Sequence, residues 1–389
     1  MDNLAVDQRE LRDTSKEPHS RAVMDFQILV SQALKTLRGL GSDFASHADR
    51  LTFLRERLEE GRLHLAVLGQ FKRGKSTLLN AFLGQALLPT SVVPLTAIPT
   101  FIYYGPELRM QVLYQDERPP KEYANLSFEE LSRTLEGLVT EEGNPRNHLG
   151  VLQVEIYHPA EILKHGVVLI DTPGIGSTFT HNTEATLNFL PQCDAALFVL
   201  SADPPLTEVE ADFLKRVKSC VTRLFFIFNK IDYLNAEELE TAVDFFKRML
   251  REKLETQDDH HTFCVSARRA LDAKLSNDSR EWQQSGLAAV EHQLMNFLLS
   301  EKTAALCDAL GKKVRDILQD SVMRLRLAIE SMKMPLADLE RRLEIFAKEV
   351  KNAERERVIA QDLLVGDRKR SLQLLEERAE ELRQRSACH

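Results

Sequence analysis

The chain has little of what would place it in several common classes of protein. Its five cysteines, among 389 residues, are odd in number and show no metal-ligand spacing, so we expect reduced thiols in a cytosolic protein. No apolar run approaches the roughly 20 residues that span a bilayer. The first residues, 1–20, are polar and mixed in charge, unlike a secretory signal. The net charge of −8 does not favour nucleic acid as a partner.

What the sequence does contain is a phosphate-binding loop. The stretch Gly69-Gln70-Phe71-Lys72-Arg73-Gly74-Lys75-Ser76-Thr77 follows the apolar run 63–68 and precedes a helical pattern at 78–82. Glycines let the backbone approach phosphate, and successive N–H groups at a helix N-terminus supply partial positive charge. We expect Lys75 to reach the β- and γ-phosphates and the Ser76 hydroxyl to ligate Mg²⁺. The predicted nucleotide-binding residues of this loop are Gly69, Gln70, Arg73, Gly74, Lys75, Ser76 and Thr77.

A second motif, Asp171-Thr172-Pro173-Gly174, ends the apolar run 167–170. A carboxylate at the end of a strand can hold Mg²⁺ through water, so Asp171 is predicted at the metal, and the Gly174 N–H is predicted to sense the γ-phosphate. Thr96, in a polar loop after the first helix, is a further predicted metal ligand that closes over the γ-phosphate. Thr90 and Thr100 compete with it for that role.

The third motif, Asn229-Lys230-Ile231-Asp232, follows the apolar run 224–228 and selects the base. Asp232 can accept two hydrogen bonds from the N1–H and 2-amino group of guanine. Adenine lacks this pair of donors and would leave the carboxylate without a partner, at a cost of roughly 3–5 kcal/mol. Further along, a backbone N–H of Ser266-Ala267 is predicted to meet the guanine O6.

Each motif alone is weak, because Asn-Lys-x-Asp and Asp-Thr-Pro-Gly are usually plain turns. Four of them in this order, three at strand ends, predict a GTP site with Mg²⁺ as cofactor. Strands alternate with helical segments over 62–300, which predicts an α/β fold: a P-loop GTPase domain with a doubly wound, extended mixed sheet. We expect an extended sheet because 75 residues separate Thr96 from Asp171, and they include alternating stretches on both sides of a helical pattern at 128–138.

Helical patterns flank this domain on both sides. Two apolar faces within 22–60 are separated by Gly39 and Gly41, and the chain beyond 300 is almost wholly helical, with a break at Pro335. Apolar residues at 3-4-3-4 spacing after Pro335 predict a long helix that packs against a partner in the same chain or another. The predicted domains are a polar tail (1–20), neck helices (21–60), a GTPase domain (61–300) and a C-terminal helical neck or stalk segment (301–389).

On these motifs the chain resembles bacterial dynamin-like GTPases. The resemblance rests on the phosphate loop, Thr96-x-x-Pro99, the second and third motifs, and the enlarged domain between helices, and it covers about residues 20–330. It implies that the helices pack as a neck, that GTP-bound domains pair across their nucleotide faces, and that pairing stimulates hydrolysis of GTP to GDP and phosphate. It also implies that neck movement remodels or fuses membranes.

Two departures from related GTPases concern catalysis. Ile175 stands where Ras-like enzymes have a water-orienting glutamine, an absence that dynamins share. Dynamins place a Gln and a cation-coordinating Ser where this chain has Phe71 and Lys72, with Gln70 one position early. Guanylate-binding proteins carry an arginine finger at the position of Lys72, so this lysine is a candidate to place positive charge at the β–γ bridge. The alternative is that Lys72 points to solvent. The predicted catalytic residues are Lys72, Lys75, Ser76 and Thr96.

The wider function stays open at this stage. Dynamin-like proteins continue through a long stalk to a membrane-touching tip, whereas this sequence ends in a charged helical region whose basic stretch 367–370, after Gly366, is expected to be a solvated turn. The expected partners are a second copy, through domain pairing and helical packing, a second dynamin-like protein, and a membrane surface at the cytoplasmic side, with no nucleic acid. The alternatives are a GTP-gated scaffold with little hydrolysis and a regulatory GTPase, whose basic RNA-binding appendage is missing.

Overall fold

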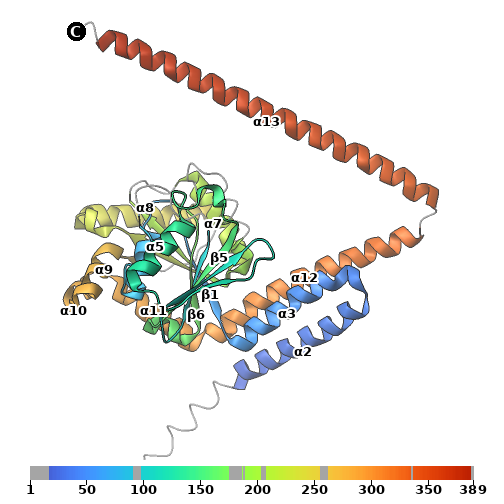
Figure 1. The fold of residues 1–389 in the computed structure, drawn as a ribbon, viewed down its shortest axis with the longest axis horizontal. Helices are drawn as coiled ribbons and strands as arrows, with labels where there is room; N and C mark the ends of the chain where they lie inside the picture. The colour runs from blue at the N-terminus through green and yellow to red at the C-terminus, as the bar shows by residue number, and fades with distance from the viewer. Residues whose placement is uncertain are drawn as a thin grey trace, which may run out of the picture. The chain divides into compact units, whose positions relative to one another are not determined.

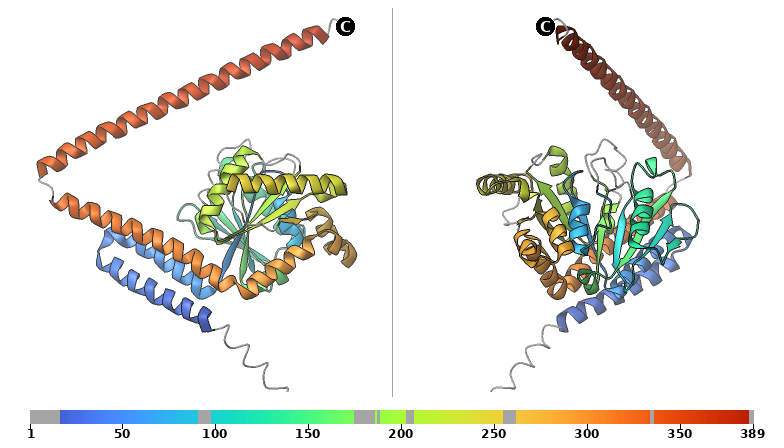
Figure 2. Two further views of the ribbon diagram at one scale, coloured as in Figure 1. Left: turned by 180° about the vertical axis from the view of Figure 1, so that it is seen from behind. Right: turned by 60° about the vertical axis from the view of Figure 1, so that its left-hand side comes forward.

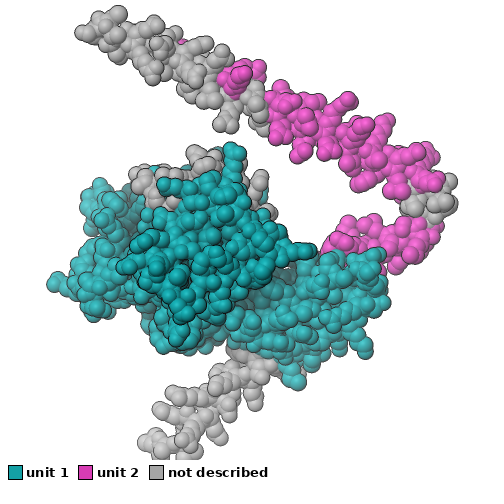
Figure 3. Space-filling model, viewed as in Figure 1, with its two compact units in different colours: residues 1–318 teal, residues 319–389 magenta. Residues whose placement is uncertain are grey.

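A computed structural model of the chain describes residues 17–90, 98–174, 186, 189–202, 207–254, 262–333 and 336–386. The chain divides into two compact units, residues 1–318 and 319–389 (Figure 3). The first unit contains the α/β domain and its flanking helices, and the second contains the remaining helical segment. Thr96 and Ile175 lie outside the described residues.

The strands of the first unit form one mixed sheet, which confirms the predicted fold class. They are β1 (Leu63–Leu68), β2 (Thr100–Tyr104), β3 (Arg109–Tyr114), β4 (Lys121–Tyr123), β5 (Val151–His158), β6 (Val167–Asp171), β7 (Ala195–Ser201), β8 (Arg223–Asn229) and β9 (Thr262–Cys264). The order is β4-β3-β5-β2-β6-β1-β7-β8-β9. Strands β6-β1-β7-β8-β9 run parallel, whereas β2 is antiparallel to β6, and β3 is antiparallel to both β5 and β4. The segment between the first two motifs supplies β2 to β5 and so extends the sheet.

Helices cover both faces of this sheet (Figure 1). They are α4 (Lys75–Leu83), α5 (Phe128–Val139), α7 (Glu208–Cys220), α8 (Ala236–Leu254), α9 (Ala267–Ser276), α10 (Ser279–Gln284) and α11 (Leu287–Ser300). Alternate residues of β1 point to opposite faces. Leu65 and Val67 share a core with α4, α5, α9 and α11, whereas Ala66 and Leu68 share a second core with α7 and α8. The doubly wound arrangement is therefore as predicted.

Three helices flank the sheet: α2 (Glu17–Gly39), α3 (Ala45–Glu60) and α12 (Lys302–Lys333). Figures 1 and 2 show α2 beside α3, with the first part of α12 along α3. The predicted break between the first two helices is confirmed, and Gly41 within it has a φ of +102°. The apolar faces predicted for α2 and α3 are buried, namely Phe26, Val30, Leu34, Leu37, Leu51, Leu54 and Leu58. The stripe predicted for α12 is buried only in its first part, at Val314 and Ile317, whereas Val322 and Ile329 further along are exposed.

In the second unit, α13 (Leu336–Ser386) is one helix of 51 residues. The turn expected at 367–370 is wrong, because these residues and Gly366 lie within α13. One glycine costs a helix about 1 kcal/mol, and strong helix formers on both sides outweigh it. Leu343, Phe346 and Val350 of the predicted seam are exposed. Among the helices that the structure describes, none has the length and apolar character needed to cross a bilayer.

Candidate nucleotide-binding site

The phosphate loop connects the buried strand β1 to α4, and its glycines have conformations that only glycine fits well. Gly69 has a φ of +143°, and a Cβ there would lie 2.4 Å from the carbonyl oxygen of Val199. Gly74 has a φ of +92°, and a Cβ there would lie 2.3 Å from Nδ2 of Asn229. Real Cβ atoms do not come this close, so both positions require glycine. The loop backbone is thereby packed against β7 and the third motif.

Lys75, the first residue of α4, folds back over this loop. Its Nζ donates to the carbonyl oxygens of Gly69 at 3.1 Å and Gln70 at 3.2 Å. Burial lowers its pKa to about 8, and the negative charge of Asp171 opposes that change. The second motif reaches the same point, because a Cβ on Gly174 would lie 3.1 Å from this Nζ. The ammonium group therefore lies where the loop and the second motif meet.

Ser76 and Asp171 form the candidate metal site. The Ser76 hydroxyl donates to Oδ2 of Asp171 at 2.8 Å, while Oδ1 is buried and has no hydrogen-bond partner among the described residues. Burial raises the pKa of Asp171 to about 6, against the charge of Lys75 and the Ser76 hydrogen bond. A hydroxyl beside a carboxylate with an unused oxygen fits a hard cation such as Mg²⁺. Thr172 secures this strand end, because its hydroxyl donates to the Val67 carbonyl at 2.7 Å.

The third motif borders a cavity of about 300 Å³ at the carboxyl ends of β1 and β8. Its lining consists of Gly74, Thr77, Thr90, Asn229, Lys230, Asp232, Tyr233, Ala267, Arg268 and Leu271. Asn229 joins the motifs, since its Nδ2 donates to the Arg73 carbonyl at 2.9 Å and its Oδ1 accepts from Ala267 N at 3.0 Å. Asp232 is exposed at the cavity, as a carboxylate that recognises guanine must be.

Ser266 and Ala267, which were predicted to contact guanine, already form hydrogen bonds within the protein. The N–H of Ser266 donates to the Ser285 carbonyl at 2.8 Å, and its hydroxyl accepts from Arg269 N at 3.3 Å at the start of α9. Because the Ala267 N–H bonds to Asn229, the predicted contact of these two residues with guanine O6 has no support in their hydrogen bonding. It stays a prediction, and the next residue, Arg268, also borders the cavity.

Lys72 and Arg73 point in different directions. Lys72 has a φ of +67° and an exposed side chain, whose Nζ lies 5.5 Å from the centre of the Phe71 ring. Arg73 is 1% exposed, and its guanidinium binds Glu210 and Ser201 inside the domain. Only the backbone of Arg73 is therefore placed to contact phosphate.

A second site, which the sequence did not reveal, lies where the flanking helices meet the sheet. The carboxylate of Asp194, just before β7, accepts from Arg57 Nη2 at 2.5 Å, Lys313 Nζ at 2.8 Å and the His64 N–H at 2.9 Å. Arg57 belongs to α3 and Lys313 to α12. We call these four residues the helix junction. One buried carboxylate thus connects both helices to β1 and β7.

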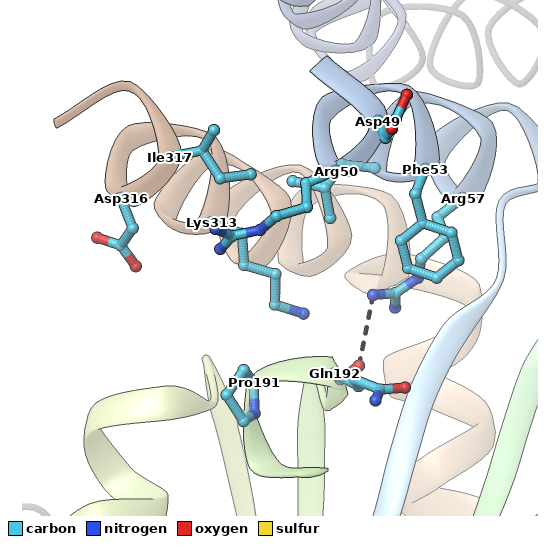
Figure 4. Close-up of a pocket in the computed structure, with 10 residues that line it drawn as sticks. Asp49, Arg50, Phe53, Arg57, Pro191, Gln192, Lys313, Asp316 and Ile317 are labelled. Carbon is cyan, nitrogen blue, oxygen red and sulfur yellow. Dashed lines mark hydrogen bonds between the residues drawn. The ribbon is translucent and has the colours of Figure 1, made fainter. Parts of the chain in front are cut away.

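A cavity of about 400 Å³ adjoins the helix junction (Figure 4). Figure 4 shows Lys313 and Arg57 extending from their helices toward the short 3₁₀ helix η4 (Leu190–Gln192), with Arg57 Nη1 bonded to the Gln192 carbonyl at 3.4 Å. The apolar part of its wall comes from Phe53, Leu54, Pro191 and Ile317.

The loop, the hydroxyl–carboxylate pair and the base cavity define a P-loop GTPase domain at the carboxyl ends of parallel strands. The family model described as "Dynamin family" matches residues 65–231, and that described as "Elongation factor Tu GTP binding domain" matches residues 151–322. By these matches the chain is similar to the bacterial dynamin-like GTPases.

Relatives agree with this assignment. An uncharacterised protein of Caldicellulosiruptor sp. is 40% identical over 64% of this chain and 60% of its own length. The bacterial dynamin-like protein of Nostoc punctiforme is 29% identical over 66% of this chain and 39% of its own length. A solved structure of an oligomerised bacterial dynamin pair has a similar fold, with a TM-score of 0.53 and 20% identity over 97% of this chain and 68% of that chain. The chain thus spans less than two thirds of the length of these two sequence relatives.

Proposed function

We propose that the protein binds GTP with Mg²⁺ and hydrolyses it to GDP and phosphate, that assembly raises the turnover, and that hydrolysis moves the flanking helices to remodel membranes. The observation that carries the nucleotide part is the arrangement of Lys75, Ser76 and Asp171. A buried ammonium lies beside a hydroxyl–carboxylate pair with one unused carboxylate oxygen, at the N-terminus of α4. Charges of this kind, fixed in a buried site, stabilise the charge that develops in phosphoryl transfer.

Each residue has a role in this proposal. The backbone of residues 69–74 surrounds the α- and β-phosphates, and Lys75 exchanges its two carbonyl partners for phosphate oxygens. Ser76 would hold Mg²⁺ directly, Asp171 would hold it through water, and Thr96 would complete the metal site. The Gly174 N–H contacts the γ-phosphate, Asp232 recognises guanine, and Lys72 supplies positive charge in place of a monovalent cation. Mg²⁺ would neutralise the phosphate charge in this site.

The helix junction supports coupling between hydrolysis and the helices. Asp171 and Gly174 sense the nucleotide in this proposal, and the chain next reaches the buried junction at Asp194, which holds α3 and α12. His64 of the junction is the second residue of β1, the strand that leads into the phosphate loop. A change at the phosphates therefore has a short route to the helices along β1.

The remaining proposals concern domains, partners and location. We assign residues 21–60 and 301–389 to the neck and stalk helices and 61–300 to the GTPase domain. The structurally similar protein is described as an oligomerised bacterial dynamin pair that senses and tethers membranes. We infer that this chain likewise pairs with itself or with a second dynamin-like protein. We place it in the cytoplasm, at the inner face of the membrane.

A binding experiment tests the nucleotide part directly. GTP, GDP and ATP are titrated by calorimetry into the protein with and without Mg²⁺, beside a Lys75→Ala variant. We expect GTP and GDP to bind, ATP not to bind, and the variant to lose affinity for GTP. Binding of ATP with equal affinity would refute the role of Asp232. GTP binding without measurable hydrolysis would favour the GTP-gated scaffold, an alternative that the absence of a glutamine at position 175 leaves open.

A further inference from the structure

Glu210 is a buried carboxylate near the phosphate loop that the functions above do not use. It is the third residue of α7 and is 0% exposed. Its Oε2 accepts from the N–H of Thr207 at 3.0 Å and from its hydroxyl at 3.1 Å, which caps the helix. A helix cap has no need of a buried carboxylate, and the second set of bonds that Glu210 makes indicates another role.

That second set comes from Arg73 of the phosphate loop. Its Nε donates to Oε1 of Glu210 at 3.0 Å and its Nη2 to Oε2 at 2.7 Å. Nη1 donates to the hydroxyl of Ser201 at 2.9 Å and to its carbonyl at 3.2 Å. Two parallel bonds between a guanidinium and a carboxylate fix orientation as well as distance. Arg73 is therefore held by α7 and by the end of β7.

This anchor lies between two residues with unusual backbone conformations. Lys72 has a φ of +67° and Gly74 a φ of +92°. A non-glycine residue with positive φ costs of order 1 kcal/mol or more and persists only where its surroundings enforce it. The fixed guanidinium of Arg73, together with the bond from Asn229 to its carbonyl, provides that enforcement. The shape of the loop thus depends on contacts that need no nucleotide.

We propose that Glu210 is a positioning residue for nucleotide binding: through Arg73 it holds the phosphate loop in its binding shape before the nucleotide arrives. This inference rests on the proposed GTP-binding function. Without Glu210, binding must also order the loop, so affinity falls. The loop contacts the phosphates that GDP and GTP share. The affinities for GDP and GTP should therefore fall by the same factor, about tenfold. Turnover at saturating GTP should stay within about threefold of the wild-type value.

Glu210→Gln, which keeps the side-chain size, tests the proposal. Ser201→Ala is a milder variant. It removes the hydrogen bond from Arg73 to the Ser201 hydroxyl and should lower the affinity for both nucleotides about threefold. The control is Glu301→Gln, which neutralises another carboxylate bound by an arginine, Arg223 at the start of β8 and away from the loop, and should leave affinity unchanged. Binding of GDP and a slowly hydrolysed GTP analogue is measured by calorimetry where all variants are folded, and kcat and KM are measured alongside.

The proposal is overturned if Glu210→Gln binds both nucleotides as the wild type does, if only kcat falls, or if the control loses the same affinity. Amide hydrogen exchange of residues 70–74 in the nucleotide-free protein gives a second readout. Exchange there should be faster in Glu210→Gln than in the wild type and the control, and unchanged exchange would contradict the inference. If the wild type binds no guanine nucleotide, the proposed function fails, and the exchange measurement still decides the role of Glu210.

Discussion

Replacing Asp194 by asparagine removes the only carboxylate among the four residues of the helix junction. The guanidinium of Arg57 and the ammonium of Lys313 then lie side by side, with side chains that are 5% and 15% exposed, and no opposite charge between them. Burial favours the neutral form of Asp194, yet these two cations outweigh it and hold its pKa below the usual value. The native junction therefore depends on an ionised Asp194.

The magnitude follows from the burial of this pair. Removing one partner of a buried ion pair costs about 3–5 kcal/mol, because the other charge stays desolvated. This is a large fraction of the roughly 5–15 kcal/mol that stabilises a folded protein. For a unit of this size we expect the Tm of Asp194→Asn to fall by about 6 °C. Thermal and urea unfolding followed by circular dichroism measure the loss.

Two comparisons make the test specific. Asp308→Asn, in an exposed pair with Lys312 on the same helix, should change the free energy of unfolding by less than about 0.5 kcal/mol. Adding Lys313→Met to Asp194→Asn removes one of the two uncompensated cations. The double variant should therefore be more stable than the sum of its single effects by at least about 1 kcal/mol. A loss below about 1 kcal/mol in Asp194→Asn, or strict additivity, would refute this account of the junction.

Three further predictions concern pH and the nucleotide site. Burial and the charge of Arg57 lower the pKa of His64 to about 3, so below pH 6.5 the unfolded state takes up the proton first and stability falls by about 2 kcal/mol between pH 6.5 and 5; unfolding of His64→Asn should lack this part of the slope. Asp232→Asn should lower the affinity for GTP at least about a hundredfold. It should raise the affinity for xanthosine nucleotides, because an amide can donate to their 2-oxo group. Unchanged GTP affinity would contradict the role of Asp232 in the base cavity. Gly69→Ala should cost more than about 2 kcal/mol by its clash with β7, whereas Gly39→Ala, which has open space, should be neutral or stabilising, as unfolding curves will show.

The fold was predictable because its signals are local. The apolar run 167–170 became β6, the helical pattern at 128–138 became α5, and the glycines at 39 and 41 mark the end of α2. The phosphate loop could be found because strand, glycines and helix follow each other directly. The continuation of α13 through 367–370 could not be predicted. Gly366 and the charged residues after it fit a turn as well as a helix when their packing is unknown.

The buried ion pairs could not be predicted because their partners are far apart in the sequence. Arg57 and Asp194 are 137 positions apart, as are Arg73 and Glu210. An arginine within a phosphate loop is expected to face phosphate, and only the folded structure shows that Glu210 draws its side chain inward. The one available signal was Thr207-x-x-Glu210, a helix-capping pattern that gives no information about what else the carboxylate binds.

We propose above that this chain is a GTPase whose turnover depends on assembly. The most direct test measures GTP hydrolysis per molecule over a hundredfold range of protein concentration, with and without liposomes, beside Lys75→Ala. The account predicts specific activity that rises with concentration or lipid and is abolished in the variant. Flat, near-zero turnover with GTP binding intact would contradict it.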